Sequence, residues 1–387
     1  MPQRLGSARL DWVILPHVLA VVLGVALVLA TTANVLRVLV VPRAGWSLSS
    51  RLIDSVVDAF FRLLTVRFRD YEKKDLVLAA QAPVFLVAQL LTWLGAYELA
   101  WLLVLWPSVG GPGAAAREAA SSMFTLGFAA TPGAGPTSAD ILAALSGLFV
   151  ITLQIAYLPT LYSAFNRREA EVTLLEVRAG MPPWGPELLA RTRYGVRAPD
   201  DLPELYARWE RWAADVAESH SNYPVLIRFR SPRSLFSWLV GLLAVMDSAA
   251  LWLSLAPSRE RLEPRLALRM GFTALRQIAG ALHMPVDNDP DPDGDIQLRY
   301  EEFAEAVERL KAVGFSLERS AEEAWPHFRG WRVNYEALAY ALAWRTDAVP
   351  APWSGPRRWR HETIEVRRPP NRLPSIKPQP PSPQVPG

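Results

Sequence analysis

The residues with the clearest chemical potential lie in one short stretch, Ser121–Ala129, which has the sequence Ser-Ser-Met-Phe-Thr-Leu-Gly-Phe-Ala. It lies between two long apolar segments and is followed by Pro132 and a further Gly/Pro cluster. The chemistry that such a stretch offers is coordination of a cation by backbone carbonyl oxygens. Non-helical backbone at membrane depth is tolerated only where protein buries it or where it lines a water-filled cavity. The stretch therefore predicts a re-entrant loop, and it points toward ion conduction.

A short helix is expected to lead into this loop. The Gly/Pro run Gly110–Gly113 breaks any helix, and Ala114–Phe124 then has a strongly helix-forming composition. The negative end of this helix dipole would point at Thr125, an arrangement that favours a cation. Gly127 can adopt positive φ at little cost, as a backbone with inward-turned carbonyls requires.

Three segments are long and apolar enough to cross a bilayer of about 30 Å, which takes roughly 20 helical residues. They run from about Trp12 to Val41, from about Leu76 to Trp106, and from about Ile141 to Phe165. The first resembles a signal peptide in having Arg4 and Arg9 before it. Its apolar stretch exceeds the about 7–15 residues of a typical signal core, so an uncleaved helix is predicted.

Basic residues in the loops predict the orientation. The loop between the second and third spans carries only Arg117, and Arg167 and Arg168 follow the third span directly. The loop between the first two spans is rich in basic residues: Arg43, Arg51, Arg62, Arg67, Arg69, Lys73 and Lys74. The positive-inside rule then places the N-terminus outside and everything after Phe165 in the cytoplasm. We expect an integral protein of the cell (plasma or inner) membrane, with the lipid bilayer as its partner.

The segment Ser47–Asp70, between the first two spans, is predicted to form an amphipathic helix. Its apolar stripe comprises Leu52, Ile53, Val56, Val57, Phe60, Leu63 and Leu64, and Arg51, Asp54, Asp58 and Arg62 lie opposite. Two interpretations stand side by side. The helix either packs on a cytoplasmic domain or lies in the interface of the inner leaflet.

The order of outer helix, pore helix, Thr-Leu-Gly-Phe and inner helix resembles the pore domain of the potassium-channel superfamily, whose filter is typically Thr-Val-Gly-Tyr-Gly. Thr125, Gly127 and Phe128 match the Thr, Gly and aromatic positions, and Leu126 replaces Val. The resemblance covers about Leu76–Gly180. The inner-helix run Tyr157–Glu169 also resembles bacterial proteins of the two-transmembrane type of potassium channel.

This resemblance implies passive conduction of potassium by a homotetramer, with the potassium ion as the permeant species and no cofactor. The candidate filter residues are Thr125, Leu126, Gly127, Phe128 and Ala129. On the third span, Gly147 or Pro159 could act as a gating hinge, and Thr152 and Gln154 could face an aqueous cavity. The alternative for these four residues is ordinary packing of small and polar side chains between helices.

One position departs from the family pattern. Ala129 stands where the second filter Gly is expected, and a Cβ there penalises the backbone geometry that turns a carbonyl into the pore. Three hypotheses follow: a potassium channel, a channel of relaxed selectivity, and a non-conducting membrane scaffold or sensor that keeps the pore-loop fold and presents a cytoplasmic domain.

The rest of the chain is predicted to be a helical cytoplasmic domain with a disordered tail. No Gly-x-Gly-x-x-Gly follows a strand, so a nucleotide-binding regulator is not predicted. Leu235–Leu255 is apolar enough for a fourth span, but Asp247 inside it and arginines on both sides favour a helix buried in the soluble core. The Pro-rich, basic tail is expected to be extended and is a candidate arm for a protein partner.

The remaining sequence features exclude several functions. The chain has no cysteine, which rules out disulfides and thiolate chemistry. With 41 basic and 38 acidic residues it offers no electrostatic case for binding nucleic acid. No nucleophile–base pair is visible, so we do not expect an enzyme. Asp289, Asp291 and Asp293 have the spacing of a calcium loop, but Tyr300 occupies the position of its bidentate Glu. An acidic turn before a helix is preferred there, and no metal site is predicted.

Together these features predict an all-α membrane protein of five parts. They are an N-terminal spanning helix (1–45), an amphipathic linker helix (46–75), a pore module (76–166), a helical cytoplasmic domain (167–347) and a disordered Pro-rich tail (348–387).

Overall fold

The computed structural model describes residues 5–41, 47–191, 201–259, 261–358 and 362–368. It is all-helical, with 74% helix and no β-strand in the described residues, as predicted. Four helical segments are long and apolar enough to cross a membrane. Arg4, Arg43 and the part of the predicted tail from residue 369 onward lie outside the described residues.

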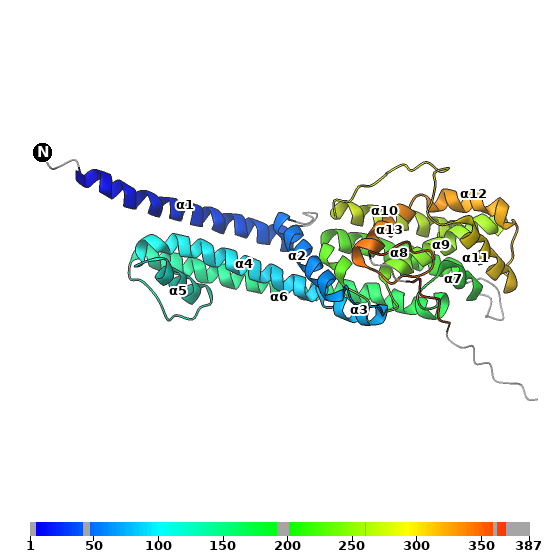
Figure 1. Ribbon diagram of the computed structural model, residues 1–387, viewed down its shortest axis with the longest axis horizontal. Helices are drawn as coiled ribbons and strands as arrows, with labels where there is room; N and C mark the ends of the chain where they lie inside the picture. Colours follow the sequence, from blue (N-terminus) through cyan, green and yellow to red (C-terminus); the bar gives the residue numbers. More distant parts are fainter. Residues whose placement is uncertain (1–4, 42–46, 192–200, 260, 359–361, 369–387) are drawn as a thin grey trace, which may run out of the picture.

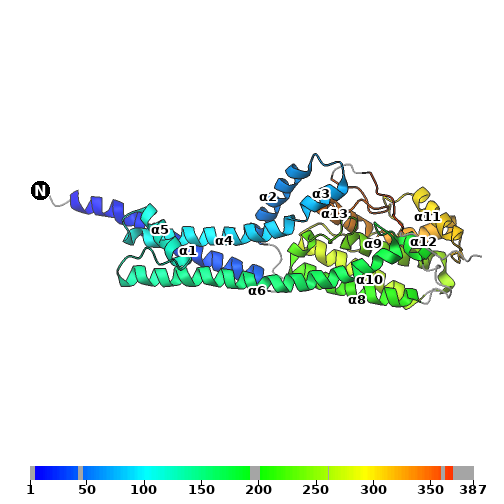
Figure 2. The same ribbon diagram turned by 90° about the horizontal axis from the view of Figure 1, so that it is seen from below.

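Three long helices form an elongated bundle, which we call the apolar bundle: α1 (Leu5–Leu39), α4 (Gln81–Leu105) and α6 (Ala134–Ala179). They run side by side, and α1 begins at the end of the bundle that is remote from the helices that follow α6 in the chain (Figure 1, Figure 2). Leu15 and Leu29 of α1 are 69% and 64% exposed, so this helix keeps an apolar face uncovered. A bilayer would cover such a face without any further protein contact.

A short hairpin of chain closes the remote end of the bundle. It consists of the 3₁₀ turn η1 (Trp106–Ser108) and the helix α5 (Pro112–Met123), which packs between α4 and α6 (Figure 1). The next helix, α6, starts at Ala134 and continues without a break through Pro159 to Ala179. The predicted third span is therefore the first part of one 46-residue helix that also enters the second half of the molecule.

The predicted linker helix is two helices in the structure. The first, α2, covers Leu48–Thr65, and the second, α3, covers Tyr71–Leu78. The chain breaks between them because the Asp70 side chain accepts a hydrogen bond from the backbone N–H of Glu72 and so caps a new helix. The second apolar segment consequently begins at Gln81, since the residues before it belong to α3.

The second half of the molecule, which we call the helical domain, packs around the far end of α6 (Figure 2). Its helices are α7 (Gly185–Arg191), α8 (Asp201–Asn222), α9 (Trp238–Leu255), α10 (Leu262–Ala281), α11 (Tyr300–Ala312), α12 (Ala321–Arg332) and α13 (Glu336–Thr346), with 3₁₀ turns η3 (Pro224–Arg228) and η4 (Pro257–Arg259). The apolar periodicity of the sequence predicts amphipathic helices over Leu202–Ser219 and Tyr300–Val313, within a few residues of the bounds of α8 and α11.

The fourth apolar helix, α9, is the centre of the helical domain. Every one of its residues is buried by the surrounding helices. Its charged residue Asp247 accepts hydrogen bonds from Arg332 (2.5 Å) and from the hydroxyl of Tyr335 (2.7 Å). A helix that keeps no exposed face has none to offer to lipid, which supports its interpretation as a core helix.

The beginning of the predicted disordered tail is part of the folded domain. Ala348, Val349, Ala351, Trp353 and Ser354 are buried. The guanidinium of Arg357 donates to the carbonyls of Ala348 and Val349. The prediction of disorder from residue 348 was therefore wrong for this segment, because its apolar side chains and one arginine find partners in the helical domain.

Candidate functional site

The helix α5 owes its position to small side chains. Pro112 occupies its first turn, where the missing N–H costs no hydrogen bond. Ala115 and Ala119 are completely buried and let the α5 backbone approach α4 and α6 closely. Met123 is also buried, so one whole face of the helix packs into the bundle.

The C-terminal end of α5 reaches deep alongside α6. The Met123 carbonyl packs against Gly147, where any added Cβ would overlap it. Gly147 lies almost four turns into α6, about 20 Å from the first residue of that helix. Ser122 Oγ donates a hydrogen bond of 2.6 Å to Asp140 Oδ1 and fixes the same end of α5 from the side. The chain thus enters the bundle as a helix and must return over residues 124–133.

The turn after α5 uses left-handed backbone at alternate positions. Thr125 has φ 56° and Gly127 has φ 70°. The N–H groups of Thr125 and Leu126 donate to the carbonyls of Ser122 (3.0 Å) and Ser121 (2.7 Å) and so close the last turn of α5. Positive φ is uncommon for a β-branched residue, which makes Thr125 a strained position held by its surroundings.

The returning segment directs its backbone N–H groups at α5. Ala129 donates to Ser121 Oγ at 3.0 Å, and Thr131 donates to Glu118 Oε1 at 2.8 Å. The hydroxyl of Thr131 also donates to Glu118 Oε2 at 2.6 Å. Within the described residues, no N–H or O–H group donates to the carbonyl oxygens of residues 124–130. Most backbone N–H groups of the loop are therefore bonded to α5, whereas its carbonyl oxygens have no donor in the described protein.

The predicted filter residues are exposed in the single chain. Leu126 is 62% and Phe128 is 52% exposed, although both are apolar. The guanidinium of Arg117 lies 5.4 Å from the centre of the Phe128 ring, a cation–π contact. Ala129 does not adopt positive φ, so the loop has no left-handed position where the second filter Gly was expected.

Sequence reasoning missed the residues that hold the loop in place. Glu118 is 3% exposed and binds Thr131 through both carboxylate oxygens. Ser121, also buried, contributes both its carbonyl and its hydroxyl to the loop. The one sequence feature that could have indicated this role is the carboxylate of Glu118 within an Ala-rich helix, since a buried carboxylate needs hydrogen-bond donors nearby.

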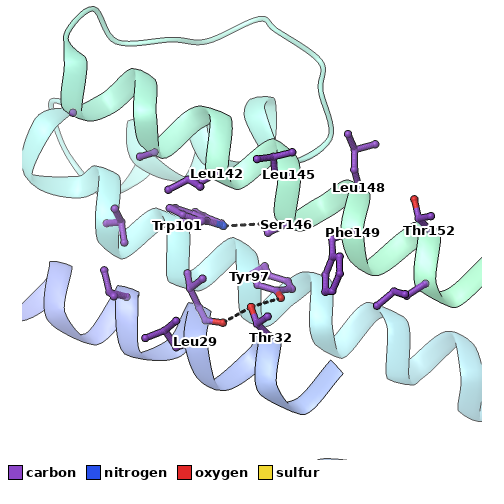
Figure 3. A pocket seen from close by; sticks show the side chains of 16 residues that line it. Leu29, Thr32, Tyr97, Trp101, Leu142, Leu145, Ser146, Leu148, Phe149 and Thr152 are labelled. Carbon is purple, nitrogen blue, oxygen red and sulfur yellow. Dashed lines mark hydrogen bonds between the residues drawn. The ribbon is translucent and has the colours of Figure 1, made fainter. Parts of the chain in front are cut away.

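The four inner-helix candidates lie on different surfaces. Gly147 is buried under α5, and Pro159 is exposed near the junction with the helical domain. Thr152 lines a groove of about 940 Å³ between α1, α4 and α6 (Figure 3). Only two pairs of polar groups bridge its walls, Trp101–Ser146 (2.9 Å) and Thr32–Tyr97 (2.7 Å). Apart from these pairs and Thr152, the groove is lined by apolar side chains.

Gln154 is buried and does not share a face with Thr152. Together with Gln89 of α4 it lines a small cavity of about 30 Å³. The amide oxygen and nitrogen of Gln89 and the amide oxygen of Gln154 have no hydrogen-bond partner among the described residues. A cavity of this size, with these amide groups in its wall, is large enough for one water molecule. Two residues apart on a helix point about 200° apart, so Thr152 and Gln154, both predicted as candidates to face an aqueous cavity, lie on different faces of α6.

The three aspartates of the calcium alternative do not gather around one point in the described structure. Asp289, Asp291 and Asp293 are exposed, and Asp291 uses a carboxylate oxygen to bind the N–H of Asp293. Asp293 also pairs with Arg329 at 3.3 Å. No cluster of three metal-binding side chains exists among the described residues. Pro290 and Pro292 keep the loop from curling its carboxylates around one point.

Comparisons with known proteins assign no family to the chain. No protein-family model matches the chain, no curated protein matches it, and no solved structure matches its fold.

Proposed function

We propose that this protein is a passive cation channel of the cell membrane, with potassium as the favoured ion. The observation that carries the proposal is the polarity of the loop after α5. The N–H groups of Thr125, Leu126, Gly127, Ala129 and Thr131 are bonded to α5, while the carbonyls of residues 124–130 accept nothing from the described protein. Carbonyl oxygens presented in this way can replace the water around a dehydrated cation.

The position of α5 supports the same proposal. Its C-terminal end, the negative pole of the helix dipole, lies at the start of the loop and favours a cation there. The contact of Met123 with Gly147, almost four turns along α6, supports a re-entrant position for this end. A loop that turns back at such depth is tolerated only where it lines water or protein.

Conduction requires several copies around one axis, since a single loop cannot enclose an ion; we propose a homotetramer. The exposed surface of α6 supports self-association. Ile141, Leu148, Ile155 and Tyr162 recur every seven residues, and they are 57%, 52%, 64% and 48% exposed. A seven-residue apolar repeat is the pattern by which parallel helices pack against one another.

We propose that α1, α4 and α6 span the bilayer, with the N-terminus outside and the helical domain in the cytoplasm. The ends of the bundle next to the helical domain adjoin the basic linker, and the remote end carries Arg117 (Figure 1). The positive-inside rule then assigns the cytoplasmic side.

A second candidate is a non-conducting scaffold or sensor. The observation in its favour is Ala129, which neither is Gly nor adopts positive φ. A filter with one left-handed Gly position presents fewer aligned carbonyls than the family pattern requires. This departure predicts weak selectivity for potassium over sodium if the protein conducts.

A matched pair of substitutions tests the channel proposal. Gly127 (φ 70°) and Gly135 (first turn of α6) both have open space where a Cβ would lie, so they differ in backbone conformation and not in crowding. In liposomes with a potassium gradient, Gly127→Ala should lower the flux about tenfold, because left-handed backbone costs an Ala residue about 1–2 kcal/mol. Gly135→Ala should leave it unchanged.

Size-exclusion chromatography of both variants checks that the assembly persists. If wild-type protein carries no potassium flux at any tested pH, calcium concentration or voltage, the scaffold replaces the channel. Equal flux through wild type and Gly127→Ala would remove the loop from the ion path.

A further inference from the structure

The helix α2 turns a mixed face inward, with Val57 and Phe61 buried beside its polar residues, and leaves a row of apolar side chains outward. Asp54 is 5% exposed, and Ser50 and Thr65 are also buried. In contrast Leu48 is 79% exposed and Leu63 is 75% exposed. Leu52, Val56, Phe60 and Leu64 complete this exposed face. Water disfavours such an arrangement, so the exposed face needs an apolar covering.

The buried polar face is fixed by charged residues of the helical domain. Arg228 donates to both carboxylate oxygens of Asp54, at 3.1 and 3.0 Å, and to Asp58 at 3.0 Å. Arg358 donates to the other oxygen of Asp58 at 2.6 Å. Arg345 adds an ion pair with Asp54 at 3.4 Å. These bonds leave α2 no freedom to rotate its apolar face inward.

The exposed face is continuous with the lipid-facing surface of the apolar bundle. Asn34 of α1 accepts hydrogen bonds from Ser49 of α2 (3.1 Å) and from Trp93 of α4 (2.9 Å). The first turn of α2 therefore lies level with the last two turns of α1, where Leu36 and Val40 are exposed. From there α2 runs obliquely across the junction between the bundle and the helical domain (Figure 2).

Basic side chains flank the apolar face. Arg51 and Arg62 are exposed along one edge of α2, and Arg67 and Arg69 are exposed just beyond its end. A helix with an apolar face and arginines along its rim is suited to the boundary between acyl chains and anionic headgroups.

We propose that α2 is an interfacial helix whose occupant is an anionic phospholipid leaflet, with the apolar face among the acyl chains and the arginines among the headgroups. This goes beyond ion conduction and needs only that α1, α4 and α6 span the bilayer. The helix α2 in contact with lipid would also be connected to α6 through the segment that carries Arg228. Arg168 of α6 donates to the carbonyls of Leu226 and Phe229, which flank the arginine that holds α2.

The absence of cysteine makes a direct test simple, because a single introduced thiol takes up all of the label. Val56→Cys places a bimane fluorophore at the centre of the apolar face. Leu262→Cys is the matched control, since Val56 and Leu262 are 61% and 65% exposed. Leu262 is the first residue of α10 and follows the C-terminal end of α9. Because α9 begins at Trp238, beside His220, and is about 27 Å long, Leu262 lies far from the junction with the apolar bundle.

The full-length protein is reconstituted in phosphatidylcholine vesicles with and without phosphatidylglycerol. Nitroxide-labelled lipid should quench the label at position 56 at least fivefold more than the label at position 262. Aqueous iodide should quench the label at position 262 more than the label at position 56. Phosphatidylglycerol should increase the lipid quenching at position 56. Leu52→Cys repeats the measurement if Val56→Cys fails to fold.

Quenching by iodide at position 56 equal to that at 262 would overturn the proposal, since the face would then be in water. Protection from both quenchers would overturn it as well, because a second copy of the chain would then cover the face. Lipid quenching that is the same without phosphatidylglycerol would overturn the assignment of anionic headgroups. None of these readouts depends on ion flux, so failure of the channel proposal is seen separately.

Discussion

Arg168 and His220 are both completely buried, and Nη1 of the arginine lies 3.0 Å from Nε2 of the histidine. An arginine can only donate, so Nε2 accepts. The other ring nitrogen, Nδ1, then carries the proton and lies 3.0 Å from Ser219 Oγ. The pair ties the part of α6 that enters the helical domain to α8 and holds His220 as a neutral imidazole.

The first prediction concerns pH. Burial, together with the charge of Arg168, lowers the pKa of His220 well below its ordinary value of 6.5. The unfolded chain therefore binds a proton as pH falls through about 6.5 while the folded chain does not. The free energy of unfolding should fall by about 1.4 kcal/mol for each pH unit below this point, until the folded pKa is reached.

Thermal unfolding of the full chain between pH 7.5 and 5.5 measures this slope. His220→Gln should remove it, because an amide does not titrate, even though the variant is less stable overall. A slope that is equal in the variant would assign the pH dependence to other groups.

Gly147→Ala should displace the tip of α5. An added Cβ would overlap the Met123 carbonyl, and such overpacking costs about 1–3 kcal/mol. The thermal midpoint in detergent should fall accordingly, and potassium flux should fall with it. Gly95→Ala on α4 is the matched control, since nothing lies within 4 Å of its Cβ position. Equal stability of the two variants would contradict the close contact of α5 with α6.

Glu118→Gln tests how the returning loop is held. The substitution replaces two charged acceptors for Thr131 by one neutral acceptor and a donor, and should cost about 1–3 kcal/mol. Unfolding in denaturant and flux in liposomes should both show the loss. Glu308→Gln serves as the control, because that carboxylate is 69% exposed and pairs with Lys311 at the surface. It should change stability by less than about 0.5 kcal/mol.

Arg228→Met tests the attachment of α2 to the helical domain. Burial alone would raise the pKa of Asp58, but Arg228 and Arg358 hold it below the ordinary value of 3.8. Removing the Arg228 charge leaves the buried Asp54 and the half-buried Asp58 each short of one partner and should destabilise the protein by about 3–5 kcal/mol. Arg62→Met breaks only an exposed pair with Asp58 and should cost at most about 1 kcal/mol. Similar losses in both variants would show that the buried network adds nothing.

The sequence by itself determined the helical class, the long apolar helices and the short helix before Thr125. These depend on local properties, namely apolar length and helix-breaking Gly and Pro residues, which neighbours in the chain decide. It could also suggest that Gly127 has positive φ, since that preference belongs to the residue itself.

Only the tertiary structure decided which faces are covered. Asp54 is buried because Arg228, 174 residues away, binds it, and this turns the apolar face of α2 outward. Asp247 is tolerated in a fully buried α9 because Arg332 and Tyr335 lie beside it. Glu118 holds the loop because the chain returns past it thirteen residues later. Burial of a charge is favourable only with its partner in place, and the partner's position is a property of the whole fold.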